Sequence, residues 1–496
     1  MASYRGTLLL LAALISAAGC RSPRQIRDRD YAQVLQTIRQ AHSSPAPAAA
    51  AVAPVAVELE GPQDVQRLIQ IALDQNPEVQ AARKRMEAMA MRVPQAASLA
   101  DPMVDAVGWP FFPNVPQTAS GRMTVDVMLS QQVPWHGKLA AKAEAAEAEV
   151  KEARSNLAAV ELATIEMVKR SYYELYYVQQ AIRLTVLEQE ELAKIRSAAY
   201  ARYRATLTSQ QDVLRAELEL SQSENELIQL RQQLASAQAR LARLLHASPQ
   251  TELRAVEELP EEQAPHDLSA LEERAVAARP ELHARLAALE RDRRMLDLAR
   301  LDYRPDFTFK LGWGEMTTSR ALAPSADGLD NVTAGVSVNV PLYRKRLDAS
   351  VREAEANVVA MARQYDALRD GTLEQVADLF AQARSQQELL QLFREDILPK
   401  ARQTYEISSS AYSVGEVDFL QLIDNFRQQL RYELSYRRLE ASLLQTLAEL
   451  ERVVGGQLPI GFDAAAPPEL PSPADDDAPS PEEIAPSVEA IRLPQP

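Results

Sequence analysis

The sequence is poor in cysteine, glycine and aromatic residues. Cys20 is the only cysteine among 496 residues, which excludes a disulfide within the chain. Glycine accounts for 15 residues and aromatic side chains for 5% of the chain. Alanine, leucine, glutamate, glutamine and arginine are abundant instead, and this composition favours long helices.

The usual motifs of catalysis and metal binding are also missing from the sequence. Its five histidines are not spaced like metal ligands, and there is no nucleophile-elbow motif Gly-x-Ser-x-Gly. The "WHGKL" segment lacks the glycines of a phosphate-binding loop. Met86, Met89 and Met91 could offer thioether ligands to a soft metal, but methionine also fills gaps between helices, and we interpret them as packing residues. The sequence therefore predicts neither an enzyme, nor a metal site, nor a cofactor.

The first 20 residues carry the features of an export signal. Arg5 supplies a positive charge, an apolar stretch follows over 8–15, and "AAGC" at 17–20 places small residues before Cys20. This pattern resembles the lipobox of bacterial lipoproteins and predicts a signal peptide over 1–19 and acylation of Cys20. The alternative is an ordinary signal peptide that happens to contain a cysteine.

Composition also marks two segments outside any folded domain. Residues 43–62 are rich in proline and alanine, and we predict a lipidated N-terminal linker over 20–62. Residues 457–496 contain many prolines and acidic side chains. This composition predicts a disordered acidic tail. The formal net charge of −15 gives no indication of nucleic-acid binding. No later stretch has 18 consecutive apolar residues, so no membrane-spanning helix is expected.

Between these segments the chain repeats itself. "LIQIALDQNPEVQAARKRM" (68–86) resembles "LEERAVAARPELHARLAAL" (271–289), and "LSQQVPWHGKL" (129–139) resembles "VSVNVPLYRKRL" (336–347). "YRATLTSQQDVL" (203–214) likewise resembles "YSVGEVDFLQLI" (412–423). The repeat predicts a duplicated unit, with one copy at 63–250, a linker at 251–266 and a second copy at 267–456.

Each copy is expected to contain two strands followed by two long helices. Alternation of apolar and polar residues predicts strands at about 101–112, 121–134, 304–315 and 331–341. Helix-forming runs predict helices at about 138–205, 209–246, 345–411 and 417–455, long enough for coiled coils. The strands fit a half-buried soluble sheet or a transmembrane barrel equally well, and four strands close a barrel only if several chains share it.

The motifs "NPEV", "SQQVPWHGKL", "YSVG" and "LIDN", in this order within a doubled plan, resemble the TolC-like outer-membrane channel family. The resemblance implies a mainly α fold with a small β part. Three chains would form a 12-stranded β-barrel in the bacterial outer membrane, continued by an α-helical coiled-coil tunnel in the periplasm. Such a homotrimer is the exit duct of a tripartite efflux system, with a periplasmic adaptor protein and an inner-membrane pump, for which we expect the resistance-nodulation-division type. The alternatives are a type I protein secretion system and a structural coiled-coil lipoprotein that does not conduct.

The resemblance also implies roles for residues at the two helical tips. It predicts a gate latch between Tyr412 and Asp212. It predicts a pore constriction at Asp424 and Gln421, where Gln421 stands in place of an acid. Val417 occupies the place of a family arginine. The residues expected to dock the adaptor are Thr206, Leu207, Val414, Gly415 and Glu416.

Independently of the family, a carboxylate repeated around a narrow opening concentrates negative potential and attracts cations. The alternative for Asp424 is an exposed residue with no role in a pore.

Overall fold

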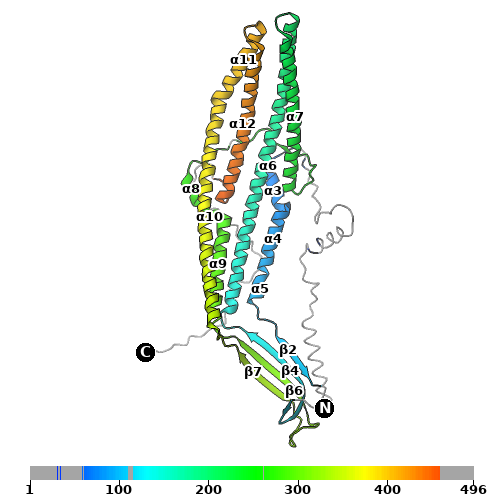
Figure 1. Ribbon diagram of the computed structural model, residues 1–496, viewed down its shortest axis with the longest axis vertical. Helices are drawn as coiled ribbons and strands as arrows, with labels where there is room; N and C mark the ends of the chain where they lie inside the picture. Colours follow the sequence, from blue (N-terminus) through cyan, green and yellow to red (C-terminus); the bar gives the residue numbers. More distant parts are fainter. Residues whose placement is uncertain are drawn as a thin grey trace, which may run out of the picture. The chain divides into compact units, whose positions relative to one another are not determined.

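Long helices make up most of the chain, and a small antiparallel sheet lies at one end of them (Figure 1). A second sheet consists of two short parallel strands. The structure, a computed structural model, describes residues 61–109, 116–260 and 262–458, together with Tyr31, Val34 and Leu59. The predicted signal peptide, Cys20 and nearly all of the acidic tail lie outside these residues. The prediction of a mainly α fold with a small β part is confirmed.

The helices are α3 (Val65–Gln75), α4 (Pro77–Ala90), α5 (Arg92–Ala97), α6 (Lys138–Arg204), α7 (Gln210–Leu244), α8 (Leu268–Ala278), α9 (Pro280–Leu301), α10 (Arg344–Leu392), α11 (Leu398–Val414) and α12 (Phe419–Val454). The strands are β1 (Pro62–Gln63), β2 (Met103–Gly108), β3 (Gln117–Thr118), β4 (Gly121–Val133), β5 (Arg254–Ala255), β6 (Phe307–Thr317) and β7 (Asn331–Val338). Helices α3–α5 and α8–α9 precede the longer strands of each half, and the sequence patterns did not predict them.

The four longer strands form an antiparallel sheet in the order β2-β4-β6-β7, and the short strand β3 pairs with the beginning of β4. In the register, Val127 lies opposite Ala106 on one side and Trp313 on the other. Strand β2 begins and ends inside the predicted range 101–112, and residues 110–112 of that range are outside the described part. Among the described residues, none of the helices is sufficiently long and apolar to cross a membrane.

Helix α6 begins directly after a tight turn and then continues for 67 residues. Gly137 precedes it with φ +90°, a left-handed conformation that glycine adopts without steric cost. No proline or glycine follows until after residue 204, so nothing interrupts the backbone hydrogen bonds. The predicted helix at 138–205 and α6 have nearly the same bounds.

The predicted helix at 345–411 is divided by a π-helical turn, Phe393–Ile397, which separates α10 from α11. Pro399 lies just beyond this turn. Proline has no N–H to donate, and its ring collides with the carbonyl four residues earlier in a regular α-helix. The wider π-turn accommodates the ring, which explains why the second half has two helices where the first half has the single helix α6.

The sheet is tied to the helices through the buried side chain of Lys138, the first residue of α6. Its Nζ lies 2.9 Å from Asp306 Oδ1 and 3.3 Å from Asp302 Oδ1, and it donates to the carbonyl of Arg304. Asp306 also accepts a hydrogen bond from the backbone N–H of Trp135 at 2.8 Å. The start of α6 is thereby fixed to the segment that leads from α9 into β6.

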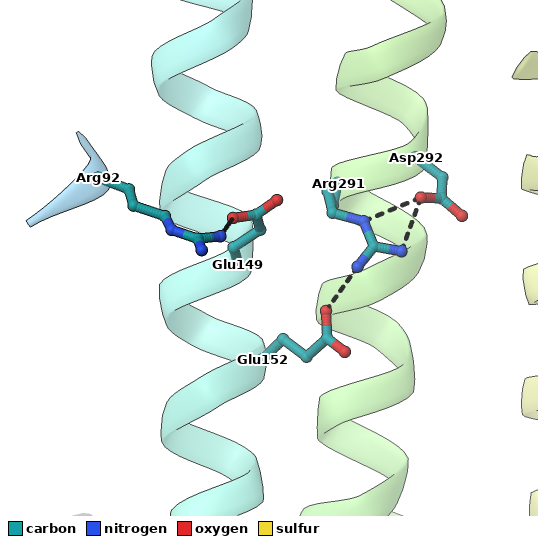
Figure 2. Close-up of polar contacts among 5 residues, drawn as sticks. All are labelled: Arg92, Glu149, Glu152, Arg291 and Asp292. Atoms are coloured by element: carbon teal, nitrogen blue, oxygen red, sulfur yellow. Dashed lines mark hydrogen bonds and ion pairs between the residues drawn. The ribbon is translucent and has the colours of Figure 1, made fainter. Parts of the chain in front are cut away.

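Ion pairs line the sides of α6 that face α5 and α9 (Figure 2). Arg92 of α5 lies 3.5 Å from Glu149, and Arg291 of α9 lies 2.9 Å from Glu152 while also bonding its neighbour Asp292. Such partly exposed pairs each contribute at most about 1 kcal/mol to stability, so they set the alignment of the helices more than their stability.

The largest buried cluster lies where α6, α7 and α12 pack against α3. It contains Tyr172, Leu175 and Tyr176 of α6 together with Leu241 and Leu444. The hydroxyl of Tyr172 donates to the carbonyl of Gln63 at 2.9 Å and accepts from the N–H of Val256 at 3.1 Å. This phenol therefore fixes the small parallel pairing of β1 with β5 against the long helices.

Candidate functional site at the helix tips

The two long hairpins, α6–α7 and α11–α12, reverse direction through short turns of similar geometry (Figure 1). Thr206 adopts φ +61° in the first turn and Gly415 adopts φ +89° in the second. The return helices also begin alike. Ser209 caps α7 by accepting from the N–H of Gln211 at 2.9 Å, and Asp418 caps α12 by accepting from the N–H of Gln421 at 2.7 Å.

Below the turns, apolar side chains from both hairpins share one core. The second hairpin contributes Tyr412, Phe419, Leu422, Ile423 and Phe426, and the first contributes Leu192, Ile195, Ala199, Val213 and Ala216. The rings of Tyr412 and Phe419 meet edge to face, with centroids 6.0 Å apart. The tips of one chain are therefore packed together and not independent.

A polar contact that the sequence did not reveal joins the tips above this core. Arg202, in the last turn of α6, donates from Nη1 to the carbonyl oxygen of Tyr412 at 2.5 Å and to that of Ser413 at 3.3 Å. Its Cζ lies 4.9 Å from the centroid of the Tyr412 ring. Arginine is frequent in this sequence and no motif marks Arg202, so only the packing of the hairpins identifies it.

The predicted latch residues, Tyr412 and Asp212, are close together but are not hydrogen-bonded. In the part of the chain that the structure describes, the buried hydroxyl of Tyr412 has no hydrogen-bond partner. The carboxylate of Asp212 accepts instead from the hydroxyl of Thr208. Burial raises the pKa of Tyr412, the charge of Asp212 raises it further, and Arg202 opposes them. The direct Tyr412–Asp212 hydrogen bond is therefore not formed in this structure, and a role of the two residues in gating stays a prediction.

The predicted constriction residues lie on the exposed surface of α12. Gln421 and Asp424 are both exposed and three positions apart on the helix, which places them on neighbouring parts of one face. Val417, which replaces the expected arginine, is half-buried in the turn. The five predicted docking residues are all exposed, and Leu207 and Val414 are prominent among them with 66% and 72% of their surface accessible.

Further from the tips, a cavity of about 650 Å³ lies between the first hairpin and α12. Glu188, Ser223, Glu226 and Arg427 are among its lining residues. Glu188 accepts a hydrogen bond from Ser223 at 3.0 Å. Burial raises the pKa of Glu188 to about 7, with smaller contributions from Glu226 and Glu219, while the Ser223 bond lowers it.

No cluster of three or more histidine, cysteine, aspartate or glutamate side chains within the described residues is placed to hold a metal ion.

Comparison with known proteins gives one family. The family described as outer membrane efflux protein matches residues 68–246 and 271–456. The chain is 22% identical over 408 residues to the cobalt-zinc-cadmium resistance protein CzcC of Cupriavidus metallidurans, covering 80% of this chain and 91% of that protein.

Solved structures give the same fold. The outer membrane protein VceC of Vibrio cholerae has a TM-score of 0.67 at 19% identity, covering 79% of this chain and 96% of that chain. CusC, solved in a study of folding and transmembrane channel formation, has a TM-score of 0.69 at 15% identity, covering 82% and 97%.

Proposed function

Because this chain belongs to the outer membrane efflux protein family, we propose that three copies of it form a passive exit duct across the outer membrane. The duct would conduct cargo delivered by an inner-membrane pump and a periplasmic adaptor. Membership in an efflux family agrees with the prediction that the chain is not an enzyme.

The sheet supports sharing of a barrel between chains. Its outer strands β2 and β7 each pair on one side only within the described residues. Unpaired strand edges in a sheet of this size are unfavourable unless another strand covers them. Pairing of β2 with β7 of the next copy would close a 12-stranded barrel of four strands per chain. In both halves, shorter helices precede two longer strands and a long helical hairpin follows them, which supports a duplicated unit.

The side chains of the sheet support a membrane environment for this barrel. Leu129, Phe309, Leu311, Val332 and Val336 are all exposed large apolar residues. Their register places them on one face of the sheet, because Leu129 pairs with Leu311, and Phe309 with Val336. Asp105, Asp126 and Lys310 fall on the opposite face. One apolar and one polar face is the pattern of a barrel with lipid outside and water inside.

The tips are proposed as the periplasmic entrance. The exposed Asp424 and Gln421 would line its narrowest part, where threefold symmetry repeats each side chain around the opening. A carboxylate repeated in this way attracts cations. The exposed residues of the turns, Leu207 and Val414 above all, would contact the adaptor.

For the cargo we propose metal cations. The similarity to a cobalt-zinc-cadmium resistance protein supports this class, and the carboxylate of Asp424 is compatible with it. For the pump, we keep the resistance-nodulation-division type as a prediction. We also keep the lipid anchor at Cys20 as a prediction, which mass spectrometry of the mature protein tests through the mass of the acylated N-terminal peptide.

Ion conductance in a planar bilayer tests the duct. The purified protein should insert and conduct, and the reversal potential in a salt gradient should show a preference for cations. Asp424→Asn should reduce that preference, whereas Asp74→Asn, a change at an exposed position of α3, should not. A protein that inserts as a trimer and never conducts would contradict the proposed function and favour a structural lipoprotein.

A further inference from the structure

Arg202 connects the two hairpins at the point where α11 ends. Its guanidinium reaches from the last turn of α6 to the carbonyl oxygens of Tyr412 and Ser413, the third-last and second-last residues of α11. The final carbonyls of a helix lack the amide partners that the rest of the helix has, and they carry partial negative charge. A cation from the opposite hairpin therefore satisfies groups that this helix cannot satisfy fully by itself.

The aromatic ring of Tyr412 strengthens the same contact. Only 3% of Tyr412 is exposed, and the guanidinium carbon lies 4.9 Å from the ring centroid. Attraction between a cation and a ring is stronger when water is excluded from both groups. Because the phenol hydroxyl has no partner among the described residues, Tyr412 is held through its ring and its backbone carbonyl.

Gly415 provides the space that the guanidinium occupies. A Cβ at this position would lie 3.3 Å from Arg202 Nη2, closer than most real contacts. The φ of +89° further disfavours any side chain there. The glycine of "YSVG" therefore has two functions, since it reverses the chain and leaves room for a charged group from the first hairpin.

We propose that Arg202 is a positioning residue of the entrance, which holds the tip of α11–α12 against α6–α7 and so sets the resting state of the duct. This chain has Val417 where the family resemblance leads us to expect an arginine. Arg202 supplies a cation to the second tip from a different helix. The inference depends on the proposed function for its gating role, but the contact between the hairpins can be measured without it.

Hydrogen exchange of the full-length protein tests the contact directly. The N–H groups of Gly415 and Glu416 are protected by the carbonyl of Ala411, at 3.0 Å each, in the turn that Arg202 holds. Arg202→Gln should speed exchange in this turn by about tenfold, the effect expected from losing a hydrogen bond to a charged group. Arg202→Lys, which keeps the charge but loses the planar fork, should give an intermediate rate.

Arg204→Gln is the matched control, because Arg204 is exposed in the same turn of α6 and its side chain forms no hydrogen bond or ion pair with the described residues. Exchange as slow in Arg202→Gln as in the wild type would overturn the inference, whether or not the protein conducts.

Conductance of the same variants in planar bilayers tests the gating role. Arg202→Gln should raise the open fraction of the resting channel by about tenfold if the lost contact holds the entrance closed. Faster exchange with unchanged conductance would overturn this role. A wild-type protein that never conducts would instead contradict the proposed function, while the exchange rates would still decide whether Arg202 holds the tips together.

Discussion

Thr206 and Gly415 occupy equivalent places in the two tips and share a left-handed backbone, with φ of +61° and +89°. For glycine this conformation is free of steric cost, but for a β-branched residue such as threonine it is rare and strained. The hydroxyl of Thr206 bonds the carbonyl of Ala205 at 2.6 Å. The first tip therefore has the same turn as the second despite a residue that does not favour it.

Replacing Thr206 by glycine should relieve this strain. A left-handed conformation costs an L-residue roughly 1–2 kcal/mol, and the greater entropy of glycine in the unfolded chain offsets about half of it. We expect Thr206→Gly to stabilise the protein by up to about 1 kcal/mol, measured by thermal unfolding in detergent followed by circular dichroism. Gly415→Ala should do the opposite, because it adds strain and crowds Arg202. A lower melting temperature for Thr206→Gly would contradict this account.

Tyr412→Phe should leave the resting conductance unchanged. The hydroxyl removed by this substitution is buried and has no partner among the described residues. An unpaired buried hydroxyl costs about 1–3 kcal/mol, so stability should stay the same or increase. Planar-bilayer recordings of Tyr412→Phe, compared with recordings of Asp212→Ala, check the prediction. Higher conductance in both variants would show that the Tyr412–Asp212 bond forms in the closed duct after all.

Lys138→Met should destabilise the junction between the sheet and α6. The substitution removes the buried ammonium that pairs with Asp302 and Asp306 and leaves both carboxylates without it. Because Asp302 is half-exposed while Asp306 is largely buried, we expect a loss at the lower end of the about 3–5 kcal/mol that breaking a buried ion pair costs. Lys142→Met, one turn further along α6 and exposed, is the control and should change stability by less than about 0.5 kcal/mol. Equal melting temperatures for the two variants would argue against this role of Lys138.

Glu188 should make stability depend on pH. The pKa of Glu188 is raised from its ordinary 4.5 to about 7, so the folded protein keeps this proton to a higher pH than the unfolded chain. The contribution of Glu188 to stability is therefore fully present below about pH 4.5 and is lost as the pH rises through 7. Glu188→Gln should reduce the fall in melting temperature between pH 5 and about pH 8.

The size of this change is limited to a few degrees, because Glu188 is only partly buried and solvent screens its charge. Glu190→Gln, at an exposed position of the same helix, should show the wild-type pH dependence. If Glu188→Gln also shows the wild-type pH dependence of the melting temperature, ionisation of Glu188 does not affect the stability of the fold.

Local features of the sequence were sufficient to predict the main elements. The absence of proline and glycine over 139–202 predicts the long helix, and residues 123–133 and 331–340 alternate as strands do. The sequence did not predict helices α3–α5 and α8–α9, although repeated motifs fall on them at 68–86 and 271–289. The π-turn before Pro399 was also missed, since a helix can accommodate proline in more than one way.

At the tips, the sequence predicts the features that depend on neighbouring residues, and the tertiary structure decides the contacts between distant ones. The sequence by itself determined where the chain reverses, because Gly415, Ser209 and Asp418 act on their own neighbouring backbone. It could not determine what Tyr412 bonds to, because that depends on side chains about 200 residues away in the chain that packing brings within a few ångströms. The tertiary structure placed Arg202 there and left Asp212 bonded to Thr208.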